Sequence, residues 1–169
     1  MNNPCIFLDR DGVLNQERGE YTYKVDDFIV PDEVFPCLQK LKNAGFLLIV
    51  ITNQGGIAKG IYTKSDMHNC HVKLQKEAGG LIDAIYYSPY HPDYTNSLGR
   101  KPGTLLFERA VAKYHINPAK SWMIGDQLRD LQPAAKLGIK GILINDKLDP
   151  DPYFAAKSLT DATNFILNF

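Results

Sequence analysis

The sequence lacks an excess of charge of either sign. Its 19 Lys and Arg residues balance 19 Asp and Glu residues in a chain of 169 residues. A protein that binds nucleic acid or an anionic membrane through its overall field needs a basic surplus, so the balance argues against both partners. We therefore expect any anionic ligand to be bound by a few local side chains.

Long hydrophobic runs and a signal-peptide pattern are also missing. No apolar run reaches membrane-spanning length, and the start, MNNPCIFLDRDG, lacks a basic segment followed by a long apolar one. We expect no membrane association and a cytoplasmic location.

Paired cysteines are absent as well. Cys5, Cys37 and Cys70 are odd in number and widely spaced, and no CxxC or CxH pattern joins them. We interpret them as free buried thiols rather than metal ligands. The length and the hydrophobic content of 44% predict one compact domain over residues 1–169.

Five short apolar runs predict buried parallel strands, and segments of helical period lie between them. This alternation predicts an α/β fold, a doubly wound (Rossmann-like) parallel sheet with helices on both faces. The expected strands are 4–8, 46–51, 82–87, 122–124 and 141–144, and the expected helices are 34–44, 64–78, 104–114 and 130–137.

Two segments do not fit the alternation. Segment 15–32 is polar and irregular, and we expect a loop or a small hairpin over the first strand. Segment 88–103 is rich in Pro, Asn and Gly, which predicts a long surface loop. Neither segment is large enough to form a separate cap domain.

Polar side chains follow four of the predicted strands, where loops open. In a doubly wound sheet the carboxyl ends of the strands meet at one edge, and ligands bind there. We therefore expect these side chains to converge on one crevice. In chain order they are Asp9 and Asp11, Thr52 and Asn53, Arg100 and Lys101, and Asp126 with Asp130.

Carboxylates crowded at one edge repel one another unless a divalent cation neutralises them. Mg²⁺ is the expected cofactor, because it prefers oxygen and binds one or two carboxylates together with water and phosphate. A bound phosphate would need Thr52, Asn53 and Lys101 as donors and positive charge. One acid of the pair Asp9 and Asp11 would attack phosphorus, and the other would transfer protons.

These residues resemble the motifs of the haloacid dehalogenase (HAD) superfamily. FLDRDGVLN resembles its DxDx[TV] motif, ITNQ its threonine motif, RKP its lysine motif and IGDQLRD its acidic motif, in the family's order. The resemblance implies a Mg²⁺-dependent phosphomonoester hydrolase that forms an aspartyl-phosphate. It implies Asp9 as nucleophile and metal ligand, Asp11 as general acid and base with its carbonyl on the metal, Thr52 as phosphoryl donor, Lys101 as charge clamp, Asp126 as metal ligand and Asp130 in the outer metal shell.

Longer stretches, including DDFIVPDEVFPCLQKLKNAGF and RKPGTLLFERA, resemble a branch without a large cap domain. This branch contains D,D-heptose 1,7-bisphosphate phosphatases and histidinol-phosphatases. It implies a small phosphomonoester as substrate, such as a sugar phosphate or heptose bisphosphate, bound by Thr52, Asn53, Arg100 and Lys101. Histidinol phosphate and nucleic-acid 3′-phosphates are alternatives. A non-catalytic binding protein is a further alternative, which the presence of the acidic motifs disfavours.

The resemblance breaks in segment 88–103. The branch usually binds a structural zinc there through a Cys-x-His and a Cys-x-Cys pair, but this chain has Ser88, Tyr90, Ser97 and Gly99. Hydroxyl groups are poor zinc ligands and glycine has none, so we predict no structural zinc. We expect the Pro and Tyr residues of the loop to hold it by packing. Gln127 also stands where the branch commonly has Lys or Arg, which leaves the substrate open.

Simpler interpretations remain for three of the candidate sites. Thr52 and Asn53 suit a helix cap, Arg100 suits a solvated loop, and Asp130 suits the first turn of a helix, where an acid favours the helix dipole.

We expect a monomer or a weak homo-oligomer. In segment 146–169, a Pro-rich turn precedes a predicted amphipathic helix at 159–167, which we expect to pack on the sheet.

Overall fold

The computed structural model describes residues 3–145, 147 and 149–169. Its centre is a six-stranded sheet in the order β3-β2-β1-β4-β5-β6, and every neighbouring pair is parallel. The strands are β1 (Cys5–Leu8), β2 (Leu47–Asn53), β3 (Ala84–Ser88), β4 (Trp122–Gly125), β5 (Lys140–Leu143) and β6 (Phe154–Ala155).

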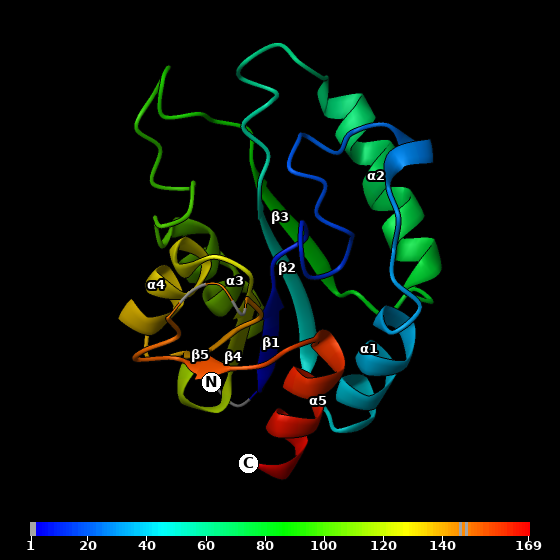
Figure 1. Ribbon diagram of the computed structural model, residues 1–169. Coiled ribbons are helices and arrows are strands. Elements are labelled where there is room, and N and C mark those ends of the chain that lie inside the picture. Colours follow the sequence, from blue (N-terminus) through cyan, green and yellow to red (C-terminus); the bar gives the residue numbers. More distant parts are fainter. Residues whose placement is uncertain (1–2, 146, 148) are drawn as a thin grey trace.

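Helices cover both faces of the sheet (Figure 1), which confirms the predicted doubly wound α/β fold. One face packs against α1, α2 and α5, and the other against α3 and α4. Their bounds are α1 (Val34–Asn43), α2 (Lys64–Glu77), α3 (Leu105–Tyr114), α4 (Leu128–Lys136) and α5 (Leu159–Asn168).

Strand β1 shows why the sheet needs both helical layers. Ile6 and Leu8 point into the core under α1, α2 and α5, whereas Cys5 and Phe7 point into the core under α3 and α4. Side chains alternate between faces along a strand, so a strand covered on both sides is a continuous apolar run. The three cysteines are free and buried, as predicted.

Two predicted boundaries need correction. The two-residue strand β6 was not predicted, because it is too short for a periodic pattern and follows the Pro-rich turn. Helix α4 begins at Leu128 rather than at residue 130. Gln127 is its N-cap, and the Asp130 carboxylate accepts a hydrogen bond from the Gln127 backbone, so Asp130 belongs to the first turn.

The connections at the carboxyl ends of β1, β2 and β3 form the loops above the sheet in Figure 1. Segment 15–32, described throughout, is a loop with one short 3₁₀ turn, η1 (Val25–Asp27), so the hairpin alternative is wrong. Segment 89–103 contains neither helix nor strand. Both connections are too short to form a cap domain.

The last helix lies where the sequence predicted it. Leu159, Ala162 and Ile166 of α5 enter the same core as α1. The Thr160 hydroxyl donates to Glu33 Oε2 at 2.6 Å, which ties α5 to the residue before α1. Residues 146 and 148 of the predicted tail lie outside the described part of the chain. Within the described part, no helix has both the length and the apolar character needed to cross a membrane.

Candidate active site

Asp9 directly follows β1 at the carboxyl edge of the sheet. Its backbone N–H donates to Ile124 O of β4 at 2.9 Å, so the residue stays tied to the sheet although the strand has ended. The turn after it brings Gly12 against Asp126. Gly12 has a φ of +82°, and a Cβ there would lie 2.6 Å from Asp126 Oδ2. Glycine therefore permits both the turn and the close approach of the two acidic loops.

Lys101 is buried in the middle of this edge. Its ammonium group donates to Asp9 Oδ1 at 2.7 Å, to Asp130 Oδ1 at 2.8 Å and to Ile51 O at 2.7 Å. An ammonium group has three hydrogens, and each has an acceptor here. Four segments that are distant in the sequence, at residues 9, 51, 101 and 130, therefore meet at one nitrogen.

Asp9, Asp126 and Asp130 form a cluster of carboxylates. One oxygen from each lies within 4.8 Å of the others. Lys101 contacts Asp9 and Asp130, which leaves the cluster with a net negative charge. Crowded hard oxygen donors with an excess negative charge fit a divalent cation such as Mg²⁺. Asp130 is therefore a member of the cluster together with Asp126.

Burial and mutual repulsion raise the pKa values of two carboxyl groups in this cluster. Burial, and next the negative charge of Asp130, raise the pKa of Asp9 to about 8. Burial and Asp130 also raise the pKa of Asp126 to about 6. Burial lowers the pKa of Lys101, but Asp130 and Asp9 together outweigh it and the net shift is upward.

The Asp11 carboxylate belongs to a second group of side chains. Arg10 Nη2 donates to its two oxygens at 2.9 and 3.1 Å, and Asn15 Nδ2 donates to Oδ1 at 3.1 Å. Arg10 is almost fully buried and also lies over the ring of Phe28, with 5.3 Å between its Cζ and the ring centroid. Arg10 thus anchors the carboxyl group of Asp11 beside the carboxylate cluster.

Thr52 and Asn53 end β2, and the next helix, α2, begins eleven residues later at Lys64 behind the cap residue Thr63, so the helix-cap interpretation is wrong. Thr52 is buried, and its hydroxyl accepts a hydrogen bond from Gln54 at 2.9 Å. Asn53 exchanges two hydrogen bonds with the Lys101 backbone, at 3.0 and 3.1 Å. Asn53 therefore fixes the loop that carries Lys101, and its contact with substrate stays a prediction.

A cavity of about 570 Å³ opens beside Asp11, and Arg100 and Arg129 lie in its wall. Neither guanidinium group has a carboxylate partner within 4.0 Å among the described residues. Burial, and next the positive charge of Arg129, lower the pKa of Arg100. Arg100 is half-buried, so the solvated-loop alternative does not describe it.

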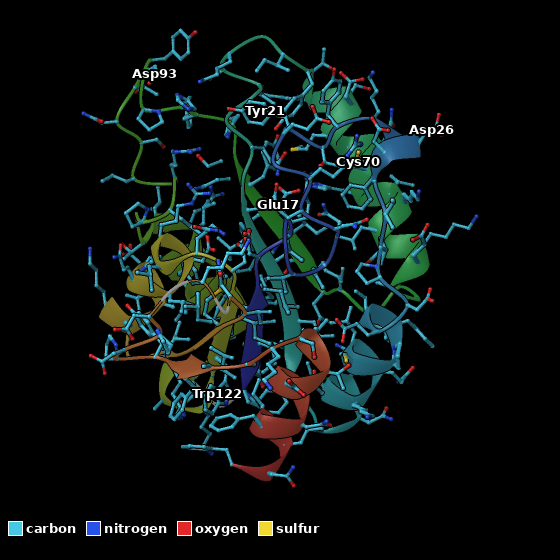
Figure 2. The ribbon with its side chains drawn as sticks, in the orientation of Figure 1. Glu17, Tyr21, Asp26, Cys70, Asp93 and Trp122 are labelled. Atoms are coloured by element: carbon cyan, nitrogen blue, oxygen red, sulfur yellow. The ribbon has the colours of Figure 1, made fainter. Side chains whose placement is uncertain are left out.

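Figure 2 shows the surroundings of this cavity. Glu17 and Tyr21, which both line it, lie over the carboxyl end of the sheet, whereas Trp122 marks the opposite end. A neighbouring cavity of about 500 Å³ reaches Asp126. Glu17 and Gln127 line both cavities, so the two spaces adjoin on either side of the acidic edge.

The loop at 88–103 is held by polar contacts. Tyr90 and Tyr94 are exposed, so the prediction that tyrosine packing holds the loop is wrong. Instead, Gln54 N donates to Ser88 O at 2.7 Å, and Arg100 Nη1 donates to Tyr90 O at 2.9 Å. Asp93 adds an ion pair with Lys59 at 3.4 Å, and its backbone N–H donates to His91 Nδ1 at 3.3 Å. The prediction of no structural zinc stays a prediction.

Four residues of this region were not singled out from the sequence. They line or support the site from positions next to a motif, or from a loop that the motifs do not reach. Arg10 stands between the two acids of DRD, and this position next to two candidate site residues could have identified it. Gln54 follows Thr52 and Asn53 at the end of a strand, and this position could have identified it in the same way. The two remaining residues, Tyr62 and Arg129, offered no clear signal.

Comparisons with known proteins agree with this geometry. The HAD-hydrolase-like family model matches residues 98–162. A D-glycero-beta-D-manno-heptose-1,7-bisphosphate 7-phosphatase from Haemophilus ducreyi is 36% identical over 149 residues, which cover 83% of this chain and 81% of the relative. The protein of the same name from Escherichia coli K12 is 36% identical over 157 residues, which cover 85% of this chain and 81% of the relative.

A solved structure shows the same fold throughout. The D,D-heptose 1,7-bisphosphate phosphatase from B. bronchiseptica, described as complexed with magnesium and phosphate, has a TM-score of 0.89 and 26% identity. The match covers 98% of each chain. By sequence identity, coverage and fold, this chain belongs to the HAD superfamily and is a phosphatase of the branch that contains the heptose-1,7-bisphosphate 7-phosphatases.

Proposed function

We propose that this phosphatase hydrolyses the 7-phosphate of D-glycero-β-D-manno-heptose 1,7-bisphosphate in a Mg²⁺-dependent reaction. The supporting observation is the cavity beside Asp11, whose wall carries the guanidinium groups of Arg100 and Arg129, neither of which pairs with a carboxylate of the described residues. A substrate with two phosphates would place one at the acidic edge near Lys101 and the other between these arginines. The names of the relatives support the same substrate.

The proposed chemistry begins with Asp9. Its carboxylate attacks phosphorus, an aspartyl-phosphate forms, and the ester bond to the sugar oxygen breaks while Asp11 donates a proton to that oxygen. Water then attacks the phosphorus of the aspartyl-phosphate and Asp11 accepts a proton of that water, while the bond from Asp9 to phosphorus breaks and frees the Asp9 carboxylate and inorganic phosphate. Lys101 and the Thr52 hydroxyl would stabilise the charge of the transferring phosphoryl group.

Mg²⁺ would be held by the carboxylates of Asp9 and Asp126 and by the backbone carbonyl of Asp11. Asp130 would lie in the outer shell while its carboxylate keeps its contact with Lys101. When bound, the cation neutralises the carboxylates and the charge of the phosphate oxygens. The oxygen cluster of Asp9, Asp126 and Asp130 supports this assignment, because its donor set suits Mg²⁺.

Nothing in the site favours the alternative substrates over the bisphosphate. Histidinol phosphate has one phosphate and an imidazole, which would meet the positive wall formed by Arg100 and Arg129. A nucleic-acid end would need a basic groove, which the balanced charge of the chain argues against. A cytoplasmic location and a monomeric or weakly oligomeric state stay predictions from the sequence.

The test is a panel of phosphorylated metabolites assayed with Mg²⁺ for phosphate release, with both anomers of the heptose bisphosphate and histidinol phosphate included. We expect the β-anomer to give the highest kcat/KM and phosphorus NMR to show the 1-phosphate as product. The substitution Asp9→Asn and the addition of EDTA should each abolish release. An enzyme that prefers histidinol phosphate, or an active Asp9→Asn variant, would contradict the proposal.

A further inference from the structure

One buried amide joins two residues of the proposed reaction. Gln54 is 1% exposed, and its Nε2 donates to Asp11 Oδ2 at 3.0 Å and to Thr52 Oγ1 at 2.9 Å. The NH₂ group of a glutamine has two hydrogens, so each hydrogen has its own acceptor. The same side chain therefore holds both the proton-transfer residue, Asp11, and the phosphoryl donor, Thr52, in position.

The hydroxyl of Tyr62 determines which way this amide faces. It donates to Gln54 Oε1 at 2.7 Å. If the amide turned over, its carbonyl oxygen would face the Asp11 carboxylate and two acceptors would meet. Burial raises the pKa of Tyr62, so the hydroxyl keeps its proton and remains a donor. The two hydrogen bonds therefore run in one direction: Tyr62 donates to Gln54, and Gln54 donates to Asp11.

The ring of Tyr62 is itself held by two neighbours. It stacks on Tyr23, with 5.1 Å between ring centroids and 10° between the planes. It also lies against Gly56, where a Cβ would lie 2.1 Å from the Tyr62 ring. Only glycine leaves room for the ring at this position. The hydroxyl therefore has little freedom to leave Gln54.

The contact with Thr52 has a chemical consequence. Because the Thr52 oxygen accepts from Gln54, the hydroxyl hydrogen of Thr52 must point elsewhere. It is thereby available to an oxygen of the transferring phosphoryl group. The neutral amide can also hold Asp11 in both protonation states, since the Oδ2 oxygen keeps a lone pair when the carboxyl group is protonated.

We propose that Gln54 and Tyr62 are positioning residues, which hold Asp11 for proton transfer and turn the Thr52 hydroxyl toward the phosphoryl group. This inference rests on the proposed function, in which Asp11 protonates the leaving oxygen. Neither residue needs to touch the substrate. Their effect on the reaction passes through Asp11 and Thr52.

The leaving group provides a test that a merely structural role would not pass. As the bond from Asp9 to phosphorus forms, the ester bond breaks and its electron pair goes to the leaving oxygen, which takes the proton of Asp11. A sugar alkoxide is strongly basic and needs this proton, whereas the phenolate of an activated aryl phosphate leaves without it. A displaced Asp11 therefore slows sugar phosphates more than aryl phosphates.

The experiment compares Tyr62→Phe with Tyr23→Phe on the heptose bisphosphate and on p-nitrophenyl phosphate. We expect Tyr62→Phe to lower kcat/KM about tenfold for the sugar and about threefold or less for the aryl ester. Gln54→Leu, which removes both donors, should show a larger loss with the same order. Tyr23→Phe keeps the stacked ring and should match the wild type, because the Tyr23 hydroxyl forms no hydrogen bond with the described residues.

Equal losses on the two substrates, or wild-type values for Tyr62→Phe on both, would overturn the inference. Circular dichroism melts show whether each variant is folded, and Tyr62→Phe remains informative if Gln54→Leu is not. The variant Asp9→Asn shows whether a failure concerns the proposed function or only the positioning role. If Asp9→Asn retains activity, the proposed function fails, whereas a failure confined to Tyr62→Phe affects the positioning role alone.

Discussion

At the scale of single residues, Lys101 connects the stability of the site with its chemistry. Its ammonium group is removed from water and compensated by Asp9, Asp130 and a backbone carbonyl. A buried charge is tolerated when each of its hydrogens has an acceptor and a carboxylate is near, and removal of one partner leaves the other charge uncompensated. The same contact that stabilises the fold therefore presents a positive charge beside the proposed nucleophile.

The substitution Lys101→Met should separate these two contributions. Without divalent cation, we expect the free energy of unfolding to fall by about 3–5 kcal/mol, because buried carboxylates lose their cation. Activity should fall by a factor of about 10² or more. Equilibrium urea denaturation measures the first effect, and phosphate release measures the second.

The exposed Lys113→Met substitution on α3 is the matched control and should change stability by about 0.5 kcal/mol or less. Mg²⁺ should return part of the stability lost in Lys101→Met, because the cation replaces the missing positive charge. An unaltered unfolding curve for Lys101→Met would contradict the contact.

The sequence could predict the residues that stand directly at strand ends. Asp9 and Asp126, each directly after a strand, meet where the strand pattern predicted, since parallel strands deliver their carboxyl ends to one edge. The sequence could not predict which hydrogen-bond partners the polar side chains have. The amide of Asn53 is bound to the Lys101 backbone, and Gln54 reaches Asp11, because both contacts depend on loop conformations without a periodic pattern.

At the scale of elements, α4 brings two kinds of charge to the site. Asp130 in its first turn accepts from the Gln127 backbone and contacts Lys101, so its place in the first turn, where an acid favours the helix dipole, is compatible with a place beside the site. Its role in the outer metal shell stays a prediction. Arg129, one residue earlier, lines the cavity beside Asp11. Gln127 is neutral where the branch commonly has a cation, and Arg129 supplies a positive charge two positions further along the helix.

The substitution Arg129→Gln should reveal what that charge binds. We expect KM for the heptose bisphosphate to rise about three- to tenfold, because one charged contact to the second phosphate is lost. KM for the corresponding heptose 7-phosphate, which lacks the second phosphate, should be unchanged. Steady-state kinetics on the two substrates measure the difference.

Lys136→Gln at the other end of α4 provides the control, because this exposed side chain is not among the residues that line the cavity. It should leave both KM values unchanged. An equal rise of KM for the two substrates in Arg129→Gln would show that Arg129 does not discriminate the second phosphate.

The elements themselves followed from the sequence to a large extent. Strands β1 to β5 and all five α-helices lie where apolar periodicity placed them, because buried runs and amphipathic faces are local signals. The exceptions are the short β6 and the start of α4, where a cap contact determines the boundary. The contacts that hold the loop at 88–103 also differ from expectation, because Asp93 forms an ion pair with Lys59, which is distant in sequence.

At the scale of the whole molecule, a neutral chain contains a locally acidic site. The overall charge is balanced, yet three acids crowd at one edge with one lysine between them. This arrangement makes stability depend on pH and on cations. The folded protein without cation binds protons at Asp9 and Asp126 that the unfolded chain releases, because their pKa values rise from the usual 3.8 to about 8 and about 6.

The sign of the pH effect follows from this difference. Between the unfolded pKa near 3.8 and the folded pKa near 8, the folded state binds more protons, so the free energy of unfolding should fall as pH rises. Mg²⁺ competes with these protons, so its stabilising effect should be larger near pH 8 than near pH 5. Thermal or urea unfolding at both pH values, with EDTA or with Mg²⁺, measures the dependence. In EDTA, Asp9→Asn should make the free energy of unfolding less dependent on pH. A free energy of unfolding that rises from pH 5 to pH 8 in EDTA would contradict the raised pKa of Asp9.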